Sequence, residues 1–315
     1  MTTAHRVVRD GPAVRVLLAD AIDYAGLFPP AHLDMPGAVA EYAAYLDSAD
    51  SWALGRFVVP AARLAELADT AAADAAASRR SLGVAVRPWR LSALLGASVY
   101  QDMALVHAFN AAQEESGEAW LGRVDSIEVR ASTPDAVAAA AEAVGGSIQC
   151  FVEIPIAGDA RPLVRAVAAA AVHAKVRTGG TTPDAFPSSD DLVRFLVACV
   201  SERVAFKATA GLHHPLRGDY ALTYATDSAR GTMYGFLNLF LASVLLQRGG
   251  DPAMARELIE ERSSDAVRLH DDGVSWRQHR FTNAQLAEAR QLAMVSFGSC
   301  SFREPLDDLT ALGML

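Results

Sequence analysis

Short apolar segments rich in β-branched residues alternate with longer alanine-rich stretches along the chain. Short apolar runs bounded by turn residues are typical of buried strands, and the alanine-rich stretches have the length and start signals of helices. The pattern predicts eight strands, at residues 14–24, 56–60, 81–88, 125–130, 148–155, 173–179, 203–211 and 233–242.

Strands that alternate with helices are typical of a parallel sheet, and eight such units favour closure into an α/β (β/α)₈ TIM barrel. The seventh βα unit is irregular, because residues 213–235 carry Pro, Gly and Asp where a helix is expected. Residues 251–315 are predicted to form a C-terminal helical extension, packed on the barrel as a cap or an oligomer contact. We therefore predict a barrel domain over residues 1–250 and this extension, with a homo-oligomer as one possible assembly.

The overall composition excludes several classes of partner. The formal net charge is −9 without a basic stripe, which argues against nucleic acid. Cys150, Cys199 and Cys300 lie far apart without a CxxC pair, so we expect buried thiols in a reducing compartment rather than disulfides or a cysteine metal site. The N-terminus has no apolar signal region and no run reaches the roughly 20 residues of a membrane span, so we expect a cytoplasmic protein.

Five predicted strands carry a charged residue near the carboxyl end, where active sites lie in this fold. Alternate residues of a strand share a face, and a buried charge needs a partner, so these side chains are predicted to pair inside the barrel. An alternative is a salt-bridge cluster that only sets strand register. The pairs on shared faces are Glu128 with Arg130, Lys175 with Arg177 and Lys207 with Thr209, while Glu153 and Asp23 stand near the ends of their own strands.

Two of these residues are lysines on consecutive strands, Lys175 in AKVRTGG and Lys207 in VAFKATAGLHHP. A lysine attacks a carbonyl only as the free amine, and a neighbouring cation lowers its pKa by destabilising the ammonium. We predict that Lys175 is the nucleophile of a Schiff-base reaction and that Lys207 lowers its pKa. The carboxylates Asp23, Glu128 and Glu153 are candidates for the proton transfers that such a reaction requires.

The succession IDYAGLFPP, RFVVPAARL, DSIEVR, CFVEIP, AKVRTGG and VAFKATAGL resembles the class I aldolases of the deoxyribose-phosphate aldolase type, over roughly residues 14–245. The resemblance implies a (β/α)₈ barrel that acts as a carbon–carbon lyase. It implies that Lys175 forms the Schiff base, that Lys207 tunes it, and that Glu128 and Asp23 relay protons.

Two turns depart from the resemblance. AGLHHPLRGDY and YGFLNLF stand where the family binds a substrate phosphate, so we expect a small carbonyl substrate that is not a phosphosugar. Arg177 stands where the family has a small hydroxyl residue, and its guanidinium suits a carboxylate or another anion. The predicted substrate contacts are Arg177, Glu153, Thr209, His213 and Arg130.

Two other functions are compatible with the same sequence. Glu128, Glu153 and either His213 or His214 are possible ligands of a divalent metal in a lyase or isomerase. A barrel that binds a metabolite without catalysis is the second alternative. No GxGxxG, P-loop or GxSxG pattern is present, and the preferred interpretation is an enzyme that uses neither a cofactor nor a metal.

Overall fold

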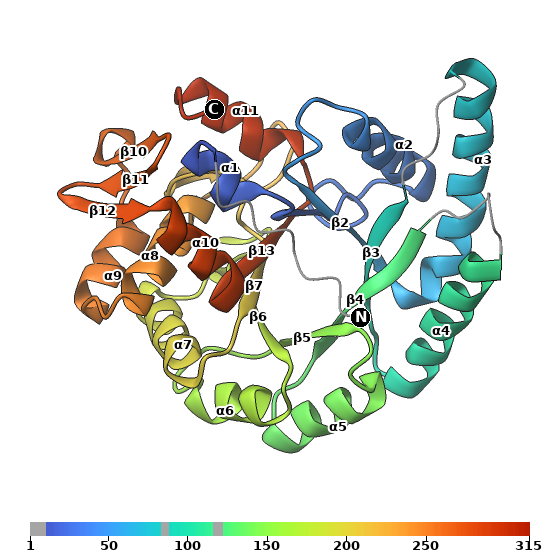
Figure 1. The fold of residues 1–315 in the computed structure, drawn as a ribbon, viewed down its shortest axis with the longest axis horizontal. Coiled ribbons are helices and arrows are strands. Elements are labelled where there is room, and N and C mark those ends of the chain that lie inside the picture. Colours follow the sequence, from blue (N-terminus) through green and yellow to red (C-terminus); the bar gives the residue numbers. More distant parts are fainter. Residues whose placement is uncertain (1–10, 83–87, 116–121) are drawn as a thin grey trace.

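The computed structural model describes residues 11–82, 88–115 and 122–315, and these form a closed barrel of eight parallel strands surrounded by helices (Figure 1). The predicted fold class, a (β/α)₈ TIM barrel, is confirmed. The barrel strands are β1 (Ile22–Tyr24), β2 (Leu54–Pro60), β3 (Trp89–Leu94), β4 (Gly122–Arg130), β5 (Gln149–Glu153), β6 (His173–Arg177), β7 (Phe206–Thr209) and β13 (Met294–Ser299).

The strand that closes the barrel is not the predicted one. β13 pairs in parallel with β1 on one side and with β7 on the other. Figure 1 shows β13 close to β7. The prediction of a strand at 233–242 is wrong, because this segment enters the helix α8 (Phe236–Gln247), whose residues are buried on every side through Leu246. A fully apolar run has no helical or strand period, so its pattern does not distinguish a buried helix from a buried strand. The barrel therefore continues past the predicted boundary at residue 250.

Two other predicted strands also differ from the structure, and one of them, 81–88, ends before β3 begins at Trp89. The segment 14–24 begins as the helix α1 (Ala13–Leu18), and only its last three residues form β1. The segment 81–88 falls mostly on residues 83–87, which lie outside the described part of the chain, and its first two residues end the helix α3 (Leu64–Leu82). The five remaining predicted strands overlap β2, β4, β5, β6 and β7.

Helices cover the outside of the barrel, and several begin at the signals expected from sequence (Figure 1). The side chains of Asp34, Thr133 and Ser188 each accept a hydrogen bond from a backbone N–H of the first helical turn, which satisfies a donor that the helix itself cannot pair. The helices between barrel strands are α2 (Met35–Leu46), α3, α4 (Val99–Glu115), α5 (Pro134–Val144), α6 (Arg161–Ala169) and α7 (Ser189–Glu202).

The sequence predicts an irregular seventh unit without a regular helix after its strand, and the structure has an antiparallel hairpin there. The hairpin consists of β8 (Gly218–Ala221) and β9 (Arg230–Met233). After α8, the chain forms α9 (Pro252–Glu260) and a three-stranded antiparallel sheet outside the barrel, then α10 (Asn283–Leu292), β13 and the last helix, α11 (Arg303–Ala311) (Figure 1). The outer sheet contains β10 (Val267–His270), β11 (Gly273–Trp276) and β12 (His279–Thr282).

The main apolar core lies between the barrel wall and the helices, whereas much of the barrel interior is polar. Buried serines, carboxylates, lysines and an arginine project from the strands inward, and Lys207 and Arg56 are 1% and 2% exposed. Buried charges are costly unless paired, so the interior side chains must be organised into networks. Over the ranges that the structure describes, no helix is long and apolar enough to cross a membrane.

Candidate active site

A cavity of about 340 Å³ opens at the carboxyl ends of the barrel strands. Its wall includes the ends of β4, β6 and β7, the turns after β6 and β7, the β8–β9 hairpin, and the segments that follow β1 and β13. This end of the barrel carries the active site in characterised enzymes of this fold. The predicted site residues that line the cavity are Glu128, Arg130, Lys175, Arg177, Lys207, Thr209 and His213.

The parallel register brings the two lysines together. Lys175 and Lys207 stand directly opposite each other on β6 and β7, and Glu153 on β5 stands opposite Lys175. Since alternate residues of a strand share a face, the parity predicted from sequence places these side chains inside the barrel. We refer to Asp23, Glu128, Glu153, Lys175 and Lys207 as the lysine cluster.

Carboxylates and ammonium groups alternate along the lysine cluster. Glu128 bridges the two lysines, with Oε1 2.6 Å from Lys207 Nζ and Oε2 2.8 Å from Lys175 Nζ. Lys207 Nζ also lies 2.6 Å from Asp23 Oδ2, and Lys175 Nζ lies 2.6 Å from Glu153 Oε2. Each ammonium is therefore held between two carboxylates, so the charges are paired although the cluster is buried.

The two lysines are held differently. Lys207 donates a hydrogen bond to Asp23 and another to Glu128, and its Nζ lies 5.4 Å from the centre of the Phe151 ring. The contacts of Lys175 are ion pairs, and the buried Glu153 Oε2 accepts no hydrogen bond from the described residues. Both lysines border the cavity, and Lys207 is in addition fixed by its two hydrogen bonds.

The electrostatic environment keeps the anchored groups charged. Burial by itself raises the pKa of Glu128, but the ammonium groups of Lys175 and Lys207 outweigh this and hold the pKa below its ordinary value. Burial likewise raises the pKa of Asp23, and Lys207 and Arg56 reverse the effect. Burial lowers the pKa of Lys207, but Asp23 and Glu128 raise it overall. Lys207 is therefore a permanent cation beside Lys175 at neutral pH.

Two arginines stand at the rim of the cavity beside Glu153. Glu153 Oε1 lies 3.3 Å from Arg177 Nε and 3.5 Å from Arg130 Nε. Both guanidinium groups are exposed, and they share this one carboxylate oxygen. Burial raises the pKa of Glu153, but Lys175 and then the two arginines lower it overall. The rim therefore has guanidinium donors left to bind an anionic group of a ligand.

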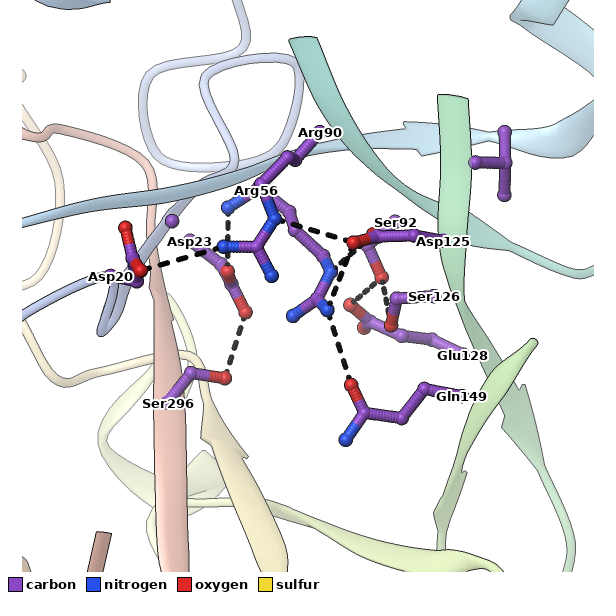
Figure 2. A network of polar contacts seen from close by, with 12 residues as sticks. Asp20, Asp23, Arg56, Arg90, Ser92, Asp125, Ser126, Glu128, Gln149 and Ser296 are labelled. Atoms are coloured by element: carbon purple, nitrogen blue, oxygen red, sulfur yellow. Dashed lines mark hydrogen bonds and ion pairs between the residues drawn. The ribbon is translucent and has the colours of Figure 1, made fainter. Parts of the chain in front are cut away.

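Serines that the sequence analysis did not single out orient the carboxylates. Ser92 Oγ donates to Glu128 Oε1 at 2.8 Å, and Ser296 Oγ donates to Asp23 Oδ2 at 2.9 Å (Figure 2). The backbone N–H of Arg56 donates to the other oxygen of Asp23 at 2.8 Å. Asp23 does not line the cavity and lies behind Lys207, so it contacts the site through that lysine. A serine at an inward position of an apolar strand is the signal that could have found these partners.

A second charged network lies inside the barrel, and Figure 2 shows it close to Asp23 and Glu128 of the lysine cluster. Arg56 Nε lies 2.5 Å from Asp125 Oδ1, and its terminal nitrogen donates to Asp125 Oδ2 at 3.2 Å and to Gln149 Oε1 at 3.1 Å. Arg90 Nε donates to Asp125 Oδ2 at 3.3 Å. None of these four residues, which we call the arginine cluster, lines the cavity. These residues were not among the predicted site residues, although the charged residue inside the apolar strand GRFVVP is a signal that could have indicated them.

The proposed metal ligands do not converge. His213 Nδ1 lies 3.0 Å from Glu304 Oε2, and His214 Nδ1 lies 2.6 Å from Asp308 Oδ2, whereas Glu128 and Glu153 are engaged by Lys175. Within residues 11–82, 88–115 and 122–315, no three His, Cys, Asp or Glu side chains are grouped so as to hold a metal ion. The predicted grouping of two glutamates with a histidine is therefore wrong.

The sequence contains a further signal that the motif analysis overlooked. Of its 28 Lys and Arg residues, only Lys175 and Lys207 are lysines. Both are buried, both face the barrel interior, and they stand opposite each other. The other 26 of these residues are arginines. The two lysines therefore occur only at the site where Glu128 contacts both of their amines.

No protein-family model, curated protein or solved structure matches this chain. A (β/α)₈ barrel is a common enzyme fold, and it supports many unrelated reactions. The resemblance to deoxyribose-phosphate aldolase-type enzymes stays a prediction from the motifs.

Proposed function

We propose that this protein is an aldolase-like lyase in which Lys175 forms a Schiff base with a small carbonyl compound. The placement of the chain's two lysines at one cavity carries the proposal. A primary amine forms an imine with a carbonyl, whereas a guanidinium stays protonated and does not. The chain has arginine at its other Lys or Arg positions, and both of its lysine side chains lie on the wall of this cavity.

Lys175 is the better nucleophile of the pair because Lys207 is fixed by two hydrogen bonds. Lys175 must first lose a proton, and Glu153 Oε2 at 2.6 Å is placed to accept it. The amine then adds to the carbonyl carbon, and the carbonyl oxygen leaves as water after protonation. The product is an iminium ion, which is formed beside the fixed positive charge of Lys207.

Cleavage of the adjacent carbon–carbon bond needs a base for the substrate hydroxyl. Glu128 lines the cavity and has one oxygen on each lysine, so it can accept this proton while remaining oriented. The electrons of the broken bond pass to the iminium nitrogen and give an enamine. Protonation of the enamine carbon and hydrolysis of the imine release the second product and restore Lys175. Asp23 acts through Lys207 as a positioning residue.

The rim favours a substrate with an anionic group. Arg130 and Arg177 share one oxygen of Glu153 and are otherwise exposed at the cavity, and Thr209 lies opposite Arg177 at the end of β7. A carboxylate suits the two guanidinium groups, with the carbonyl directed toward Lys175. Small 2-oxo acids and their aldol adducts are therefore the substrate class to test first.

The test is borohydride reduction in the presence of a panel of small aldehydes, ketones and 2-oxo acids, followed by intact mass and peptide mapping. Because the chain has two lysines, a reduced adduct can lie only on Lys175, Lys207 or the terminal amine. We expect an adduct on Lys175 that is lost in Lys175→Arg and retained in the matched variant Lys207→Arg. An adduct on Lys207 in Lys175→Arg would reassign the nucleophile. Binding of a carbonyl compound without any reducible adduct would instead favour a metabolite-binding barrel.

A further inference from the structure

A second group of reactive side chains lies on the wall of the same cavity. Cys300 directly follows β13, His213 lies in the turn after β7, Glu304 lies in the first turn of α11, and Tyr224 lies at the tip of the β8–β9 hairpin. All four line the cavity, and none belongs to the lysine cluster. Four segments that are distant in the sequence therefore bring a thiol, an imidazole, a carboxylate and a phenol together.

The contacts within this group centre on His213. Its Nδ1 lies 3.0 Å from Glu304 Oε2 and 3.9 Å from Cys300 Sγ. The hydroxyl of Tyr224 donates to Glu304 Oε2 at 3.1 Å and lies 3.4 Å from Cys300 Sγ. The imidazole and the phenol thus both approach the sulfur, and Glu304 orients both of them.

The charge on His213 follows from these neighbours. Burial lowers the pKa of His213, but its contacts with Cys300 and Glu304 outweigh burial and raise the pKa to about 10. His213 is therefore an imidazolium at neutral pH. The nucleophilic form of a cysteine is its thiolate, and an imidazolium close to the sulfur is placed to protonate the oxygen of a carbonyl group that the sulfur attacks.

The other two cysteines provide an internal comparison. Cys150 and Cys199 are buried, do not line the cavity, and lie in surroundings that raise their pKa by burial, to about 12 for Cys150. Cys300 is also buried in the chain, yet it borders the open space of the cavity. A small reagent that enters the cavity reaches this thiol without unfolding of the barrel.

We infer that Cys300 is a nucleophilic site that adds reversibly to small aldehydes bound in the cavity, with His213 as its acid partner. The thiolate forms a bond to the carbonyl carbon, the π electrons of the C=O bond pass to the oxygen, and the His213 imidazolium donates its proton there. The product is a neutral thiohemiacetal, and the reverse steps release the aldehyde. This site uses none of the lysine cluster and goes beyond the proposed function.

The test measures iodoacetamide alkylation of each cysteine by peptide mass spectrometry in full-length Lys175→Arg, in which residue 175 cannot form an imine. We expect Cys300 to react at least about tenfold faster than Cys150 and Cys199, because it borders the cavity and the other two thiols do not. Propionaldehyde should slow the labelling of Cys300 and leave the rates of the other two unchanged. Equal rates for the three cysteines, or no protection by the aldehyde, would overturn the inference.

Two further variants test the role of His213. His213→Gln and Glu304→Gln should each slow alkylation of Cys300 about tenfold while Cys150 and Cys199 keep their rates, which also reports that the barrel is intact. A uniform change at all three thiols would mean that the variants act by loosening the fold, and would argue against the assigned partner. The borohydride experiment on the unmodified chain tests the Schiff-base proposal independently of these alkylation rates.

Discussion

The barrel interior contains two charged networks that use different basic residues. In the arginine cluster, one guanidinium engages both oxygens of Asp125 and the side chain of Gln149, and no member faces the cavity. In the lysine cluster, each amine lies between two carboxylates, and Lys175, Lys207 and Glu128 border the cavity.

The choice between arginine and lysine distinguishes a cluster that supports the structure from one whose amine can react. A planar guanidinium with several donors satisfies fixed acceptors in two directions and cannot be deprotonated in a protein, which suits a buried support. An amine has a single nitrogen that can lose a proton and form a bond to carbon. Reciprocal exchange of the two residue types should therefore have opposite effects in the two clusters.

The largest expected effect is on chemistry at the lysine cluster. Lys175→Arg keeps the positive charge between Glu128 and Glu153 but removes the amine, so the reducible adduct should disappear completely. The larger side chain should cost only about 1–3 kcal/mol of unfolding free energy through overpacking. Borohydride trapping and urea denaturation of the same preparation measure the two quantities. A folded variant that still forms an adduct elsewhere on the barrel would argue against Lys175 as the nucleophile.

The reciprocal exchange, Arg56→Lys, should affect stability instead. Lysine preserves the charge beside Asp125 but cannot reach both of its oxygens and Gln149, so a buried acceptor is left without its donor. We expect the free energy of unfolding to fall by about 2–4 kcal/mol, because hydrogen bonds to charged groups contribute about 1.5–3 kcal/mol each. Urea denaturation gives the loss, and the adduct on Lys175 should persist. A loss below about 1 kcal/mol would contradict the structural role of Arg56.

Acid should weaken the lysine cluster through its carboxylates. The pKa of Glu128 is lower in the folded protein than its ordinary value of 4.5, so the unfolded chain binds this proton more readily. The contribution to stability is complete above about pH 4.5 and is lost as the pH falls toward the folded pKa. Between pH 6 and pH 3, Glu128→Gln should lose less stability than the unmodified chain, by up to about 2 kcal/mol at 1.4 kcal/mol per pH unit. Urea denaturation of both proteins at the two pH values measures these losses. Equal losses would show that the pKa of Glu128 in the folded protein is not lowered.

The smallest expected effect is a difference of about 1 kcal/mol between two glycine variants, and it concerns the turn that carries His213 to the cavity. Gly211 has a φ of +71°, and a Cβ there would lie 2.9 Å from Phe186 Cε1 and 3.1 Å from Gly179 Cα. Gly211→Ala should therefore destabilise more than Gly145→Ala, since Gly145 has a φ of +73° with nothing within 4 Å of a Cβ. We expect about 1–2 kcal/mol for the backbone conformation at either site, plus about 1 kcal/mol for the contact at Gly211. Urea denaturation gives the free energy of unfolding of each variant, and the difference between the two variants is the cost of the steric contact at Gly211. Equal free energies of unfolding would contradict this contact.

Much of the barrel and the centre of its site followed from local patterns. Alternation of apolar strands and alanine-rich helices predicted the fold, and parity along each strand predicted that Lys175, Lys207 and Glu128 face the interior. Both inferences hold because the period of a strand is local, and because parallel strands bring their carboxyl ends to one side. The same patterns did not predict the hydrogen bonds of Ser92 and Ser296, because the position of a serine on the inward face of a strand does not indicate which carboxylate it contacts.

The sequence by itself determined the alternation of elements, the inward faces of the strands and the presence of only two lysines. Tertiary structure alone decided that β13 closes the barrel, because the apolar segment in α8 fits a buried helix and a buried strand equally well until its neighbours are known. Closure through β13 also places Asp23 on Lys207, 184 residues away, and brings Cys300 to His213. These contacts depend on which strands lie side by side, and that order is set by packing of the whole chain.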